Sequence, residues 1–150
     1  MSNRINLRKS DPAAYKAMLV FDAFSESTNL KIVHRDLIKI RASQLNGCAY
    51  CIDMHTKEAR ANGETEQRIY ALTAWRETPF FSEEERAILA LTEEVTNISN
   101  RVSDETYNHA ARLFDEKYLS EVLIAIVAIN SWNRIGVATN LAPVLDKIPA

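Results

Sequence analysis

The sequence predicts an all-α fold: one helical domain, residues 1–150, with about six to seven helices. Three observations favour this fold class. The 150-residue chain contains only three glycines and four prolines, and every proline fits the boundary of a segment. Apolar residues recur at intervals of three and four through most of the chain. No stretch alternates apolar and polar residues over the length of a β-strand.

Capping and breaking residues set the expected helix boundaries. An acidic capping residue before Pro12 predicts the first helix start, and Asn46-Gly47 predicts a turn. Gly63 fits the position just after a helix end. Pro79 breaks the chain before a capping box that begins at Ser82. The expected helices span about residues 12–24, 30–45, 49–60, 64–75, 82–98, 103–114 and 120–139.

The last expected helix is apolar on most sides over residues 122–129. A helix that is apolar all round is buried all round, and a domain of this size leaves part of that surface for another subunit. The sequence therefore predicts an obligate homo-oligomer. Two histidines outside the cysteine motif, His34 and His109, are expected at the surface.

Charge and hydropathy exclude two classes of partner. The net charge is −2 and the basic residues are spread along the chain, so we expect no nucleic-acid partner. The most apolar run is too short to span a bilayer, and the N-terminal residues resemble no signal peptide. We therefore expect a cytoplasmic protein with no membrane partner.

Both cysteines lie in one motif, Cys48-x-x-Cys51, and His55 follows four residues later. On a helix these three side chains fall within an arc of about 60°. The thiolate is the reactive form of cysteine, and a helix N-terminus with a neighbouring imidazole lowers the pKa of a thiol. His55 is placed to take a proton from Cys51. In a reducing compartment such a motif is more often catalytic than structural, so the pattern favours redox chemistry.

Two other interpretations of the motif stay open. The cysteines could be small buried apolar residues with no chemical role. Alternatively, Cys48, Cys51, His55 and Asp36 could form a four-ligand zinc site, although the chain has no second cysteine pair. Haem attachment requires a histidine directly after the second cysteine, and Ile52 stands there. Asp36, on the preceding helix, could instead orient the imidazole of His55.

Three stretches, residues 37–55, 80–96 and 129–137, resemble the AhpD-like alkylhydroperoxidase family of the carboxymuconolactone decarboxylase superfamily. The resemblance covers most of the chain. It implies an AhpD-like helical fold and a homo-oligomer, usually a trimer or a hexamer. The decarboxylases of this superfamily lack the Cys-x-x-Cys motif, so the resemblance favours peroxidase over decarboxylase activity.

The resemblance also implies an activity: thiol-dependent reduction of hydroperoxides, with the cysteines cycling between dithiol and disulfide. No cofactor would be bound, and an external dithiol would supply electrons, whether a small thiol, a lipoyl group or a thioredoxin-like protein. The family's acidic relay residue, normally Glu, corresponds to Asp36. Tyr50 stands where some members have a relay histidine.

The residues suggest how the roles divide. We expect Cys51 to attack the peroxide, because His55 is one helical turn away, and Cys48 to be the more exposed cysteine that meets the reductant. We expect Asp36 to reach His55 directly or through a water and to raise the pKa of His55. A non-catalytic redox sensor or scaffold with the same disulfide remains the alternative function.

Overall fold

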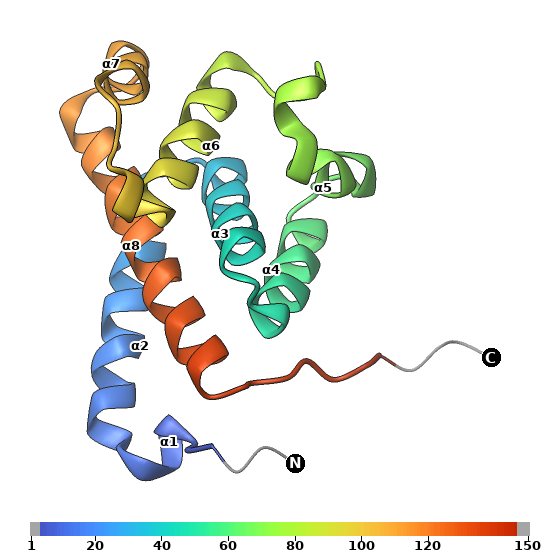
Figure 1. Cartoon of the computed structure of the whole chain (residues 1–150), viewed down its shortest axis with the longest axis vertical. Helices are drawn as coiled ribbons and strands as arrows, with labels where there is room; N and C mark the ends of the chain where they lie inside the picture. Colours follow the sequence, from blue (N-terminus) through green and yellow to red (C-terminus); the bar gives the residue numbers. More distant parts are fainter. Residues whose placement is uncertain (1–3, 147–150) are drawn as a thin grey trace.

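The structure, a computed structural model, describes residues 4–146 and confirms the all-α prediction, since every regular element within these residues is a helix (Figure 1). The helices are α1 (Leu7–Ser10), α2 (Pro12–Glu26), α3 (Ile32–Asn46), α4 (Ala49–Ala61), α5 (Glu66–Ala71), the 3₁₀ helix η1 (Leu72–Glu77), α6 (Glu83–Thr96), the 3₁₀ helix η2 (Ile98–Asn100), α7 (Asp104–Leu113) and α8 (Glu116–Ala138). The short α1 is one turn that the sequence did not predict, closed by an Asn6 cap.

Helix α3 is the centre of the fold, packed against α4, α6 and α8 (Figure 1). On one side, Ile38 and Ala42 enter an apolar cluster shared with α6 and α8. On the other side, Leu37 and Ile40 enter a second cluster shared with α4, α5, η1 and α6. All four side chains are at most 1% exposed. α3 therefore forms the common wall of both clusters and fixes the position of α4, which carries the cysteine motif.

The predicted helix over residues 64–75 is divided in the structure. α5 gives way to η1, where Ala74 leaves the helical region with φ −120° and ψ 32°. Residues three apart lie in line on a 3₁₀ helix, so Leu72 and Trp75 both point into the core, at 0% and 4% exposure. The indole Nε1–H of Trp75 donates to Glu93 of α6 at 2.9 Å. These contacts favour the tighter turn over a continued α-helix.

Helix α8 begins four residues earlier than predicted, because the side chain of Asp115 caps it by accepting from the Tyr118 N–H at 2.7 Å. Among the described residues it is the one helix long and apolar enough to cross a membrane by length and composition. It packs against α2, α3, α4, α6 and α7. It is the core helix of the domain, and its apolar composition follows from that position.

Helix α2 is poorly covered within one chain. Ser25 is its only buried residue, while Leu19 is 45% and Phe24 is 59% exposed. Its contact with α8 includes Tyr15, whose ring lies edge-on to Trp132 with centroids 5.7 Å apart. The apolar face expected for this helix is thus left largely open.

His34 is buried, so the expectation of a surface residue was wrong. It is 2% exposed, and its Nδ1 lies 2.8 Å from the Tyr118 hydroxyl. Tyr118 enters from α8 and stacks on Phe114 at 5.0 Å between centroids. Burial lowers the pKa of His34, and nearby Lys31 lowers it further. His109 is half-buried near Glu83.

Candidate active site

The predicted Asn46-Gly47 turn positions the two cysteines. Gly47 ends α3 in the left-handed conformation, with φ 65°, which glycine adopts at little cost. The N–H of Cys48 donates to the carbonyl of Ser43 at 3.0 Å and closes the turn. The chain then enters α4 with Cys48 as the N-cap residue and Cys51 in the first turn.

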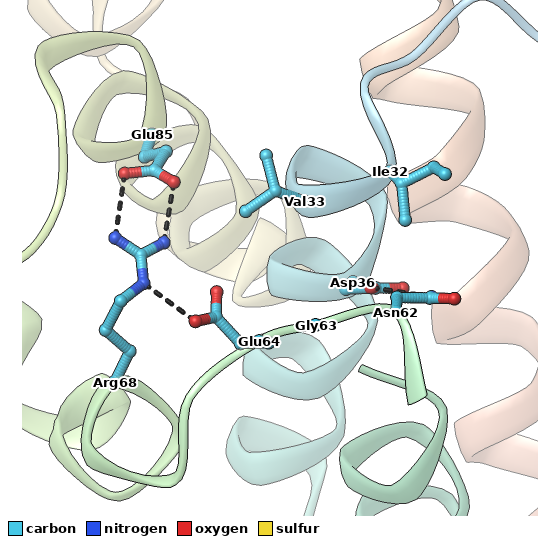
Figure 2. A pocket seen from close by; sticks show the side chains of 8 residues that line it. All are labelled: Ile32, Val33, Asp36, Asn62, Gly63, Glu64, Arg68 and Glu85. Carbon is cyan, nitrogen blue, oxygen red and sulfur yellow. Dashed lines mark hydrogen bonds and ion pairs between the residues drawn. The ribbon is translucent and has the colours of Figure 1, made fainter. Parts of the chain in front are cut away.

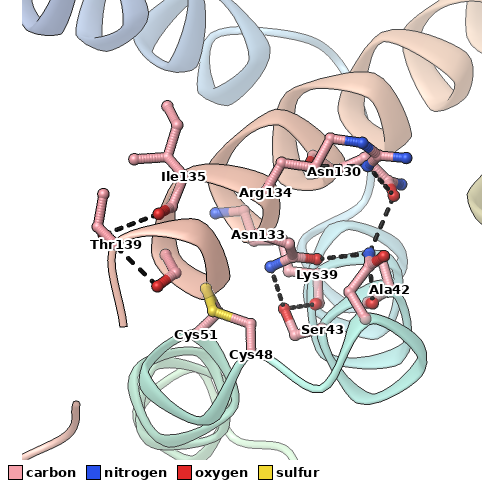
Figure 3. The surroundings of a disulfide bond; sticks show 12 residues. Lys39, Ala42, Ser43, Cys48, Cys51, Asn130, Asn133, Arg134, Ile135 and Thr139 are labelled. Atoms are coloured by element: carbon pink, nitrogen blue, oxygen red, sulfur yellow. Dashed lines mark hydrogen bonds between the residues drawn. A yellow bond between two sulfur atoms is a disulfide. The ribbon is translucent and has the colours of Figure 1, made fainter. Parts of the chain in front are cut away.

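Cys48 and Cys51 form a disulfide, with their Cα atoms 5.3 Å apart (Figure 3). Cys48 is 2% and Cys51 is 4% exposed, so the expectation that Cys48 is the more exposed cysteine was wrong. The reason is Gly136 of α8. A Cβ on Gly136 would lie 2.9 Å from Cys48 Sγ and 3.6 Å from Cys51 Sγ. Glycine lets the backbone of α8 close over the sulfurs.

A buried polar network joins α3 to α8 beside the disulfide (Figure 3). Asn133 is fully buried, and its Nδ2 donates to Ser43 Oγ at 3.0 Å. Its Oδ1 accepts from Asn46 Nδ2 at 3.0 Å, and the same amide donates to Asn130 Oδ1 at 2.9 Å. Every buried side-chain polar atom in the described part of the chain has a hydrogen-bond partner. The network therefore holds the two helices at a fixed spacing around the sulfurs.

His55 lies on α4, one turn after Cys51, and is 7% exposed. Its Nδ1 is 2.7 Å from Oε2 of Glu58. Burial lowers the pKa of His55, and the hydrogen bond to Glu58 only partly offsets that effect. The expectation that a carboxylate raises the pKa of His55 above its ordinary value was therefore wrong: desolvation outweighs the neighbouring charge.

Asp36 has a partner other than His55. It is 6% exposed, and its Oδ2 accepts from Asn62 Nδ2 at 2.9 Å. No hydrogen bond joins it to His55 among residues 4–146, so of the two arrangements expected, direct contact is not formed. Burial raises the pKa of Asp36, with the Asn62 bond acting in the opposite direction.

Asp36 and Asn62 line a surface pocket of about 340 Å³ (Figure 2). Across the pocket, the Arg68 guanidinium bonds Glu85 at 2.6 Å and Glu64 at 2.9 Å. These pairs neutralise one another locally. The pocket adjoins α3 and the end of α4, whereas the sulfurs lie at the opposite end of α4.

Tyr50 and the zinc interpretation receive no support from the geometry. Tyr50 is half-buried and hydrogen-bonds no side chain or backbone group within residues 4–146. Cys48 and Cys51 bond to each other, while His55 and Asp36 are bonded to Glu58 and Asn62. The residues that the structure describes contain no group of three or more His, Cys, Asp or Glu arranged to hold a metal ion. This arrangement does not assemble the four proposed ligands.

The sequence contained signals for residues that we did not select. Glu58 stands three positions after His55, the spacing at which helical side chains meet. Gly136 is a lone glycine inside an apolar helix, which often marks a close approach. Asn133 follows the apolar block of the same helix, and its burial depended on the packing of α3 against α8.

The family can be assigned from the sequence as a whole. Residues 12–94 match the carboxymuconolactone decarboxylase family, and this chain belongs to that family. The uncharacterized protein YdfG of Bacillus subtilis (strain 168) is 47% identical over 139 residues, covering 92% of this chain and 95% of that protein. The uncharacterized protein YnjA of Escherichia coli (strain K12) is 29% identical over 118 residues, covering 78% and 65% of the two chains.

Solved structures show the same fold. The crystal structure of ATU0492 from Agrobacterium tumefaciens, a protein of unknown function considered a candidate AhpD antioxidant defence protein, matches with a TM-score of 0.93 and 39% identity, covering 97% of this chain and 100% of that one. The debrominase Bmp8 in complex with 2,3,4-tribromopyrrole matches with a TM-score of 0.80 and 19% identity, covering 88% and 71%. The fold is therefore the all-α AhpD-like fold.

Proposed function

We propose that this chain is a thiol-dependent peroxidase of the AhpD-like type, acting on hydroperoxides in the cytoplasm. The observation that carries the proposal is the Cys48–Cys51 disulfide at the start of a helix, with His55 one turn further along. Family membership supports redox chemistry at this pair, because the AhpD-like neighbour at 39% identity is considered a candidate antioxidant protein.

The reaction divides into three steps. In the reduced protein, one thiolate attacks the O–O bond of the hydroperoxide, which leaves as an alcohol after taking a proton, and the cysteine becomes a sulfenic acid. The second thiol displaces water from that sulfenic acid and forms the disulfide. An external dithiol then reduces the disulfide by thiol–disulfide exchange and leaves as its own disulfide. The net reaction converts one hydroperoxide and one dithiol into alcohol, water and an oxidised dithiol.

Within this scheme Cys51 is the attacking cysteine and His55 its base. The buried imidazole is held neutral by its lowered pKa, which suits it to accept a thiol proton near neutral pH. Cys48 then serves as the resolving cysteine. Asp36 takes part as a relay residue only if a water joins it to His55, and Tyr50 stays a weaker relay candidate.

Access to the sulfurs limits the reductive step. At 2% and 4% exposure, neither sulfur can be reached by a dithiol in the arrangement seen here. We expect reduction to require an opening of the contact between Gly136 and the disulfide. A small dithiol, a lipoyl group or a thioredoxin-like protein could serve as reductant. We also propose a homo-oligomer, a trimer or hexamer, because α2 exposes its apolar side chains.

Peroxide turnover tests the function. Reduced protein treated with one equivalent of an alkyl hydroperoxide should consume it and lose the mass of two hydrogens in an intact mass spectrum. With excess dithiol, many equivalents should be consumed. Cys51→Ser should abolish consumption, whereas Cys48→Ser should react once and stop. Unconsumed peroxide with no change in mass would overturn the proposal.

A redox sensor or scaffold is the second candidate, favoured by the burial of the disulfide. A sensor needs slow exchange, which shielding of the sulfurs provides. The two functions differ in turnover. A sensor forms the disulfide once and then stops even in the presence of dithiol, whereas an enzyme continues until one substrate is exhausted.

A further inference from the structure

The imidazole of His55 is held by a carboxylate from its own helix. Cys51, His55 and Glu58 are four and three residues apart, the spacing that places side chains on one helical face. Nδ1 of His55 and Oε2 of Glu58 are 2.7 Å apart, within the range of a charge-assisted hydrogen bond. The two side chains differ in exposure, at 8% for His55 and 48% for Glu58. Glu58 thus joins the buried ring to solvent.

The hydrogen bond determines which nitrogen of His55 is free. An ionised carboxylate can only accept a hydrogen bond, so Nδ1 must carry the proton. In the neutral imidazole the other nitrogen, Nε2, is then unprotonated and can act as a base. Without a partner at Nδ1, the ring could protonate Nε2 instead, and that tautomer cannot accept a thiol proton through Nε2.

Other charged groups near His55 come from neighbouring helices. Lys39 of α3 opposes the charged imidazolium, and Asp22 of α2 favours it. Lys39 is itself paired with Glu26 of α2. Of these groups, Glu58 alone is hydrogen-bonded to the ring within the described residues. It is therefore the group placed to stabilise the imidazolium that forms when His55 accepts a proton.

We propose that Glu58 is a positioning residue for His55: its carboxylate accepts the Nδ1–H and keeps Nε2 free to take the proton of Cys51. The proposal rests on the proposed function, since only that function requires a base for the thiol. It gives the buried base a carboxylate partner that the Asp36–Asn62 pair does not supply in this structure.

The tautomer can be measured without any assay of activity. ¹⁵N spectra of the disulfide form should show Nδ1 of His55 protonated at neutral pH, with the signal assigned by its loss in His55→Asn. Glu58→Ala should mix the tautomers and lower the pKa of His55 further, and Glu58→Gln should lower the pKa while keeping an acceptor. Asp53→Asn, which removes a carboxylate from the same helix, is the matched control, because Asp53 pairs with Lys57 and not with His55. An unchanged tautomer and titration in Glu58→Ala would overturn the proposal.

The reduced protein gives the second readout. Alkylation of Cys51 by iodoacetamide, measured in a Cys48→Ser background, should be about ten-fold slower in Glu58→Ala near pH 7, because weaker base assistance lowers the thiolate fraction. The two rates should converge as the pH rises towards about 9, where the thiolate forms unaided. A merely structural role would lower stability but leave this profile in place, and that result would contradict the proposal. If Glu58→Ala changes both readouts and wild-type protein consumes no peroxide, the proposed function fails and the role of Glu58 stands.

Discussion

Gly136 of α8 lies against the sulfur of Cys48, so closely that a Cβ would come within 2.9 Å of Sγ. Glycine inside a helix is unfavourable by about 0.5–1 kcal/mol relative to alanine. The close approach gives a physical reason for a glycine at this position. It also couples the packing of the core helix to the oxidation state of the cysteines, because the sulfurs occupy the space next to α8.

Gly136→Ala should separate the stability of the two redox forms. In the disulfide form the new methyl group overpacks the site, at a cost of about 1–3 kcal/mol. In the dithiol form the sulfurs can rotate apart, and the gain in helix propensity offsets the strain. We expect the variant to unfold at lower urea concentration than wild type only when oxidised, and its reduction potential to rise by roughly 20–40 mV. Equal destabilisation of both forms would show that the glycine serves packing alone.

Stability should fall as the pH drops from about 7 to about 5, because two buried histidines have lowered pKa values. The unfolded chain takes up protons near the ordinary value of 6.5, whereas folded His34 and His55 take them up only at lower pH. Proton uptake therefore favours unfolding across this window. The raised pKa of Asp36 acts in the opposite direction. Glu85 and Glu93, whose pKa values are lowered from 4.5, add to the loss only at lower pH.

Urea denaturation of the oxidised protein at several pH values measures this effect. His34→Asn or His55→Asn should each flatten the slope of unfolding free energy against pH, and the double variant should flatten it most. A slope that is the same in wild type and both variants would assign the pH dependence to other groups.

Asp36→Asn tests whether Asp36 acts on His55 through a water. Because Asp36 is bonded to Asn62 and not to His55, we expect its loss to slow peroxide consumption by less than about ten-fold, and less than Glu58→Gln does. Asp36→Glu, with a longer side chain, should be tolerated or raise the rate if a relay exists. Full activity of Asp36→Asn from about pH 6 to about pH 9 would make Asp36 a residue of the pocket alone.

Local signals in the sequence were sufficient for most of the fold. The Asn46-Gly47 turn, the helix after it and the capping box at Ser82 all lie where short-range rules place them. These features depend on a few neighbouring residues, so one sequence can reveal them. The division between α5 and η1 could not be foreseen, because it follows from the contact of Trp75 with Glu93 of another helix.

The site was predictable only in part for the same reason. The disulfide and the placement of His55 follow from spacing along one helix. The burial of the sulfurs depends on α8, whose Gly136 is distant in sequence and was not connected with the motif. The pairing of Asp36 with Asn62 required the relative position of α3 and the end of α4. His34 was misplaced because its partner, Tyr118, lies far along the chain.

Phe24→Glu should break the proposed oligomer. Phe24 is 59% and Val20 is 64% exposed on α2, and together with Leu19, at 45%, they form an apolar surface that one chain leaves in water. A carboxylate buried in an interface without a partner is strongly unfavourable, so light scattering at micromolar concentration should give an oligomer for wild type and a monomer for the variant. Tyr70→Glu is the matched control, since Tyr70 is 73% exposed on α5 and outside that surface. If wild-type protein is already a monomer, or if both variants dissociate equally, α2 is not the interface.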